Sequence, residues 1–125
     1  MLTDTNFWID AANELNRGIV GPARAFMARH RASRLEVSII TWGELAVGVE
    51  SPSDLDWLLR RIRILYLPMH VAWEAGRIEN ELADAGGRLG ENDNWIAATA
   101  RVWGLQLVTR DRAFSRVRGL RLMNY

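Results

Sequence analysis

Residues 35–49, LEVSIITWGELAVGV, contain the pattern that decides the fold, a strand that passes directly into a helix. The segment from Leu35 to Ile40 is rich in β-branched residues, which favour strands. From about Thr41 to Val49 the sequence predicts a helix, and Glu44 lies on it. A strand followed by a helix is the unit that builds parallel sheets, because parallel neighbours need a long crossover connection.

The same order of strand and helix continues on both sides of this stretch. Further strands are predicted at residues 1–3, 65–67, 105–109 and 120–123, the last of them at a sheet edge. Apolar residues at helical spacing predict helices at residues 8–19, 23–30, 52–62, 75–85 and 92–103, with Asn92 as a helix cap. This alternation predicts an α/β fold in which helices cover both faces of a mostly parallel sheet of four to five strands. Because 125 residues are about the size of one domain, residues 1–125 are predicted to form a single domain.

The composition excludes several classes of chemistry. All sixteen basic residues are arginine, so Schiff-base chemistry, pyridoxal phosphate attachment and a phosphate-binding loop lysine have no residue to use. Cysteine is also absent, which excludes disulfides, thiolate nucleophiles and cysteine-ligated metals. We expect a cytoplasmic protein without membrane association. No leader-like segment is present, and the longest stretch without a charged residue, Ile64–Trp73, is too short to cross a bilayer.

Four acidic residues fall at the ends of the predicted strands and the starts of the helices. Asp4 lies at the end of the first strand, and Asp111 follows Thr109 at the end of a later one. Glu44 and Asp93 lie near the starts of two helices. The carboxyl ends of parallel strands share one edge of the sheet, where ligands bind. We therefore expect the four acids to lie together, although any one of them alone is better explained as a cap or a surface residue.

Carboxylates that crowd together repel one another unless they are protonated or neutralised. A hard divalent cation is the natural neutraliser, and Mg²⁺ prefers oxygen ligands and keeps several waters. Such an ion can bind a phosphodiester, stabilise charge on its oxygens and activate water. The predicted reaction is metal-dependent phosphodiester hydrolysis.

Four local strings make this prediction more specific. They are residues 3–6 (TDTN), residues 41–45 (TWGEL, with Gly48 following), residues 92–100 (NDNWIAATA) and residues 107–114 (LVTRDRAF). In their order they resemble PIN-domain nucleases, and with the chain length they resemble the VapC toxins of VapBC toxin–antitoxin systems. The resemblance covers nearly the whole chain. One difference is Thr3, which stands where an apolar strand residue is usual.

The resemblance implies a PIN-like three-layer α/β/α fold and an endoribonuclease that depends on Mg²⁺ or Mn²⁺. Asp4 and Asp93 would be the principal metal ligands, Glu44 would complete the site directly or through water, and Asp111 would be the fourth acid. Asn6 and Thr109 match polar positions that orient the ligands. The implied partners are an RNA substrate, such as tRNA or rRNA, a VapB-type antitoxin and a second copy of the chain.

Arginines and tryptophans give weaker signals. Basic clusters at residues 29–34, 60–63 and 110–125 are expected in part to flank the acids and bind the RNA backbone, although solvated faces or internal ion pairs explain most of them. Trp57 lies off the apolar face of its helix, so it is either a docking residue for an antitoxin helix or a second subunit, or partly buried in the monomer. Trp42 and Trp103 are predicted to be packing residues.

Two other functions remain open from the sequence. One is a PIN-like module that binds RNA or protein without cleaving. The other is an RNA-processing nuclease that is not a toxin. Four acids that repel one another have no use in an inactive module, so the retention of all four disfavours the first.

Overall fold

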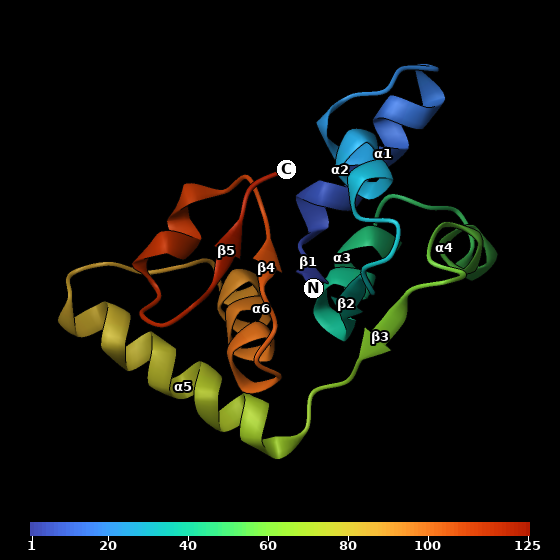
Figure 1. Cartoon of the computed structure of the whole chain (residues 1–125). Helices are drawn as coiled ribbons and strands as arrows, with labels where there is room; N and C mark the ends of the chain where they lie inside the picture. The colour runs from blue at the N-terminus through green and yellow to red at the C-terminus, as the bar shows by residue number, and fades with distance from the viewer.

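The computed structural model describes all residues, 1–125, and contains five strands in one parallel sheet with the order β3-β2-β1-β4-β5. Figure 1 shows β1 and β4, which are far apart in sequence, side by side in the middle of the sheet. In chain order the elements are β1 (Leu2–Thr3), α1 (Thr5–Asn16), α2 (Pro22–Arg29), β2 (Glu36–Ser38), α3 (Ile39–Ala46), α4 (Pro52–Leu58), β3 (Arg63–Leu65), α5 (Met69–Asp84), α6 (Glu91–Val102), β4 (Leu107–Val108), the 3-10 helix η1 (Arg112–Arg116) and β5 (Leu122–Met123). The predicted α/β class and parallel sheet are confirmed, with β5 at an edge.

Two apolar cores lie on opposite faces of the sheet. Successive strand residues point to opposite faces, so Leu107 packs with α5 and α6 while Val108 packs with α1, α2 and α4. Helix α3 contacts both α1 and α6 and thus lies between the two groups. The result is three layers, with helices on both sides of the sheet (Figure 1). None of the helices combines the length and the apolar character that crossing a bilayer requires.

Several predicted boundaries were wrong by a few residues. The strand predicted to end at Ile40 ends at Ser38, because the Ser38 hydroxyl accepts a hydrogen bond from the Thr41 N–H (3.0 Å) and caps α3. The strand predicted at residues 65–67 lies at Arg63–Leu65, where its pairing with β2 ends at Leu65 opposite Ser38. The predicted cap Asn92 is instead the second residue of α6.

Thr3 is tolerated in the buried strand β1 because its hydroxyl both donates and accepts a hydrogen bond. The hydroxyl donates to the Glu36 carbonyl (3.0 Å) and accepts from the Trp8 indole N–H (2.8 Å). A buried polar group is tolerated when it is hydrogen-bonded in this way. These contacts connect β1 to β2 and to α1, which fixes the position of the next residue, Asp4.

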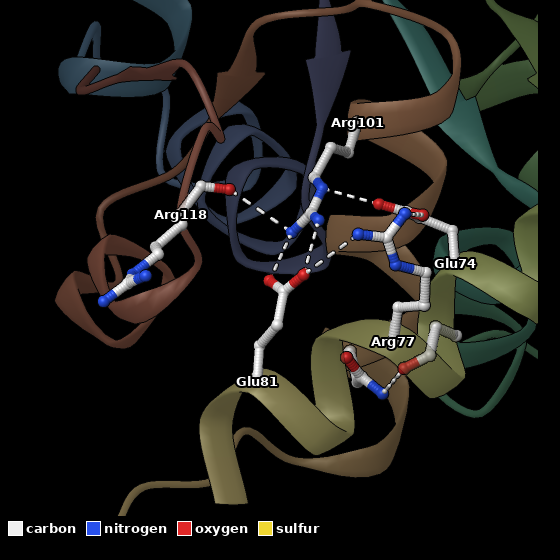
Figure 2. Close-up of polar contacts among 7 residues, drawn as sticks. Glu74, Arg77, Glu81, Arg101 and Arg118 are labelled. Carbon is white, nitrogen blue, oxygen red and sulfur yellow. Dashed lines mark hydrogen bonds and ion pairs between the residues drawn. The ribbon is translucent and has the colours of Figure 1, made fainter. Parts of the chain in front are cut away.

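A polar cluster joins α6 to α5 and fixes how the two helices pack together (Figure 2). The Arg101 guanidinium donates twice to the Glu81 carboxylate (3.0 Å each) and its Nε lies 2.6 Å from a Glu74 oxygen. This bidentate geometry is the strong form of an arginine–carboxylate pair, and it holds the pKa of Glu81 below its usual range. Nearer the start of α6, the Asn94 amide donates to the Ala75 carbonyl (3.0 Å). These bonds at both ends of the helix fix the first turn of α6, which carries Asp93.

Candidate active site

Asp4 is the buried centre of the site. It follows β1 and caps α1, so its Oδ1 accepts from the Phe7 N–H (2.8 Å). Its Oδ2 accepts from the Thr109 hydroxyl (2.5 Å), because β1 and β4 are parallel neighbours that end at the same level. The residue is only 2% exposed. Asp4 therefore has a single orientation, set by one helix start and one neighbouring strand.

Thr109 links Asp4 to the fourth acid, Asp111. Its hydroxyl oxygen accepts from the Asp111 N–H (2.9 Å) while donating to Asp4. The Asp111 carboxylate then accepts from the Ala113 N–H (2.8 Å) and caps η1. One hydroxyl group thus orients a carboxylate from β1 and the loop that carries a carboxylate after β4.

Glu44 reaches the same region from α3. Its Oε1 accepts from the Asn92 amide (2.9 Å), and its Oε2 accepts from the Thr5 hydroxyl. Thr5 is in the first turn of α1, next to Asp4, and Asn92 is in the first turn of α6, next to Asp93. Two helix starts that carry site acids therefore also orient the Glu44 carboxylate.

Asp93 lies in the first turn of α6 and is half-buried. Gly90 precedes the helix, and a Cβ atom placed there would lie 3.3 Å from the Asp93 carboxylate. The missing side chain of Gly90 thus leaves the Asp93 oxygens room to turn. The buried alanines Ala97, Ala98 and Ala100 of the same helix pack in the core on one face of the sheet.

The four carboxylates influence one another electrostatically. Burial raises the pKa of Asp4, and the negative charges of Asp93 and Asp111 raise it further. Burial also raises the pKa of Asp93, with additions from Asp111 and Glu44. Although the chain has sixteen arginines, none of them forms an ion pair with these four acids. The structure thus brings the four together as a cluster of uncompensated negative charge at the carboxyl edge of the sheet.

The ligand chemistry of this cluster suits a hard divalent cation. The available donors are all carboxylate oxygens, the ligand type that Mg²⁺ and Mn²⁺ prefer. No three of the acids are arranged so that they could hold an ion by themselves. Mg²⁺ commonly uses one or two carboxylates and keeps several waters, so a complete protein cage is not needed.

A second layer of residues behind Asp4 was not predicted from the sequence. The Tyr125 hydroxyl donates to Asp10 (2.7 Å), and Asp10 also pairs with Arg110 (3.2 Å). Burial raises the pKa of Tyr125 far above its usual range, and the Asp10 and Asp4 carboxylates contribute. Asp10 and Tyr125 lie near opposite ends of the sequence, so the contact is visible only in the folded structure. Asn6, predicted to orient a ligand, is exposed and makes no hydrogen bond to the four acids.

Comparison with known proteins finds relatives that are named VapC nucleases. Ribonuclease VapC2 of Haemophilus influenzae is 41% identical over 103 residues, which are 75% of this chain and 77% of that protein. The tRNA(fMet)-specific endonuclease VapC of Salmonella typhimurium is 32% identical over 101 residues, 74% of this chain and 76% of that protein.

Solved structures share the same architecture. VapBC2 from Rickettsia felis, bound to a DNA fragment from the promoter, superposes with a TM-score of 0.85 and 27% identity over 98% of this chain and 96% of that one. DNA-bound VapBC from Salmonella typhimurium superposes with a TM-score of 0.80 and 27% identity, with the same coverage. The family model of the PIN domain matches residues 1–120, a span that contains all four acids and four of the five strands. The chain therefore belongs to the PIN domain family.

Proposed function

We propose that this protein is a metal-dependent endoribonuclease, the toxin of a type II toxin–antitoxin system, which hydrolyses RNA phosphodiester bonds and is neutralised by an antitoxin. The observation that carries the proposal is the cluster of four carboxylates without a counter-ion at the carboxyl edge of a PIN fold. Relatives named Ribonuclease VapC and neighbours solved as VapBC complexes support the ribonuclease and toxin parts.

In this proposal Asp4 and Asp93 bind Mg²⁺ or Mn²⁺, Glu44 completes the site directly or through water, and Asp111 is the fourth acid. When bound, such an ion polarises phosphate oxygens and lowers the pKa of water. The chain supplies orientation. Thr109 fixes the second oxygen of Asp4, and Asn92 fixes Glu44, so the carboxylates need little rearrangement when the ion and the RNA arrive.

A metal-free mechanism has little support among the side chains. The chain has no lysine and only two histidines. His30 stacks on Phe26 at the end of α2, and His70 is exposed in the first turn of α5. Neither makes a hydrogen bond to the four acids, so neither is placed as a general acid or base for the RNA 2′-hydroxyl.

The direct test is cleavage of tRNA and rRNA by the purified chain with Mg²⁺, with Mn²⁺ and with EDTA. We expect cleavage with either metal, none in EDTA, and products that carry a 5′-phosphate, which ligation-based sequencing of the ends detects. Binding without cleavage under all three conditions would instead favour the inactive module. Growth arrest on expression, and relief by a small DNA-binding protein encoded by the neighbouring reading frame, would separate a toxin from an RNA-processing nuclease that is not a toxin.

The antitoxin is proposed to bind an apolar groove between α1, α2 and α4. The groove has a volume of about 320 Å³ and Trp57 is one of its lining residues. Trp57 is 58% exposed, in agreement with its predicted position off the apolar face of its helix. Arg60 lies over the Trp57 ring (5.2 Å), and Arg24 and Arg61 also line the groove. An apolar floor with a basic rim fits an amphipathic helix with acidic flanks.

Trp57→Ala should weaken antitoxin binding about tenfold, because a large exposed aromatic in a groove is a typical interface anchor. Isothermal titration with the antitoxin measures the loss. The control is Val47→Ala, which removes a side chain that is 90% exposed and lies outside the groove. Equal affinity of the Trp57 variant and the wild type would place the antitoxin elsewhere.

A second copy of the chain is proposed to cover another apolar surface. Tyr66, Met69 and Trp73 lie together in sequence around the start of α5, and all are more than 70% exposed. Trp103, predicted as a packing residue, is 41% exposed and lines a groove of about 410 Å³ with Tyr66. Large apolar side chains left exposed close together mark protein interfaces. A monomer in sedimentation velocity at micromolar concentration would contradict the homodimer.

A further inference from the structure

A cavity adjoins the acidic cluster and is not explained by metal binding. It has a volume of about 610 Å³ and lies where β4, η1 and β5 meet. Two of its lining residues, Thr109 and Asp111, belong to the site described above. The remaining polar lining comes from Arg110, Arg112, Ser115, Asn124 and Tyr125. Its size is within the range of small-ligand sites, about 300–1,000 Å³.

The two arginines of this cavity differ in how they are used. Arg110 forms an ion pair with Asp10 (3.2 Å), which also accepts the Tyr125 hydroxyl, so Arg110 is part of a fixed wall. Arg112 is exposed and forms no side-chain hydrogen bond or ion pair. Its guanidinium therefore has all of its donors available, in the planar arrangement that suits a phosphate.

The backbone beside Arg112 is well defined. Arg112 is the first residue of η1, and Asp111 caps that helix by accepting from the Ala113 N–H (2.8 Å). Asp111 is itself bonded to Thr109 through its N–H (2.9 Å). The unpaired guanidinium is thus attached one residue from the acidic cluster, by a turn that two hydrogen bonds stabilise.

An RNA substrate needs a positively charged side chain beside the acidic cluster. The four carboxylates repel a polyanion, and a bound ion neutralises the charge only at the reacting phosphate. We propose that Arg112 binds the phosphate next to the cleaved one, so that the neighbouring nucleotide of a single-stranded RNA segment lies in the cavity lined by Asn124 and Tyr125. This assignment rests on the proposed ribonuclease function and names the residue that places the strand in the site.

Arg112→Ala is the test, with Arg112→Glu as a second variant that reverses the charge. Cleavage of a single-stranded oligoribonucleotide with Mg²⁺ should show KM raised about tenfold for Arg112→Ala and more for Arg112→Glu, with kcat within about twofold of wild type. The slope of log affinity against log salt, measured by anisotropy in the Asp93→Asn background, should become shallower by about 0.7, the value for one phosphate contact on a single strand. Arg17→Ala is the matched control, since Arg17 is exposed, lies outside the three basic clusters and follows the end of α1, the helix end far from Asp4.

The outcomes separate this inference from the proposed function. Wild-type KM and salt slope in both Arg112 variants, or a loss confined to kcat, would overturn the role of Arg112 while the ribonuclease assignment stands. If the wild-type chain does not cleave RNA with either metal, the proposed function itself fails. Circular dichroism of each variant checks the fold, which should be unchanged because the Arg112 side chain makes no internal contact by hydrogen bond or ion pair.

Discussion

Asp93→Asn should reduce RNA cleavage by at least about a thousandfold while leaving the fold intact. The amide is nearly the same size as the carboxylate but lacks the charge that binds a divalent cation. A catalytic metal contributes several kcal/mol to transition-state stabilisation, and each 1.36 kcal/mol corresponds to a tenfold change in rate. The measurement is the initial rate of oligoribonucleotide cleavage at saturating Mg²⁺.

Thermal unfolding in EDTA is the control for this variant. Burial and the neighbouring acids Asp111 and Glu44 raise the pKa of Asp93 in the folded protein. An acid whose pKa is raised in the folded state stabilises the fold at pH values below its pKa in the unfolded chain, about 3.9. This contribution is lost as the pH rises through the pKa of the folded state. At neutral pH the charge is therefore unfavourable without metal, and Asp93→Asn should melt at the wild-type temperature or above it. Cleavage at the wild-type rate would remove Asp93 from the mechanism.

Thr109→Val should lower cleavage by about 10–100-fold, the usual cost of losing a group that orients a metal ligand. The valine keeps the shape of the side chain but removes the hydroxyl that donates to Asp4 and accepts from the Asp111 N–H. The free energy of unfolding should also fall by about 1–3 kcal/mol, since the part-buried Asp111 N–H and the buried Asp4 oxygen lose their partner. Rate measurements and urea unfolding test the two parts separately.

Thr109→Ser is the matched control, because it restores the hydroxyl and removes only a methyl group. We expect the serine variant to recover most of the activity that valine loses. If serine and valine are equally impaired, packing around the methyl group, and not the hydrogen bond to Asp4, explains the effect of position 109.

Much of the fold could be predicted because its signals are local. The passage from residues 35–40 into a helix, repeated along the chain, is enough to predict a parallel sheet. The placement of Asp4 and Asp111 followed from the same reasoning, because Asp4 comes directly after β1 and Asp111 lies in the loop that follows β4. Where a residue's position depends on one neighbouring element, the sequence is sufficient.

Apart from strand ends such as Ser38, which a local cap decides, the errors arose where two distant elements decide the outcome. Asn92 has the composition of a helix cap, but its amide bonds to Glu44, which only the packing of α3 against α6 makes possible. Trp103 lies on an apolar stripe, yet it is part of a groove open to solvent beside Tyr66. The contact of Asp10 with Tyr125 joins the two ends of the chain and has no local signal.

The central claim is that Asp4 and Asp93 together bind a divalent cation at the carboxyl edge of the sheet. Anomalous diffraction from crystals grown with Mn²⁺ tests it directly. The prediction is a manganese peak about 2.0–2.2 Å from a carboxylate oxygen of each residue, at the distance typical of a small octahedral cation. A manganese ion located elsewhere, in a protein that cleaves RNA with Mn²⁺, would contradict it.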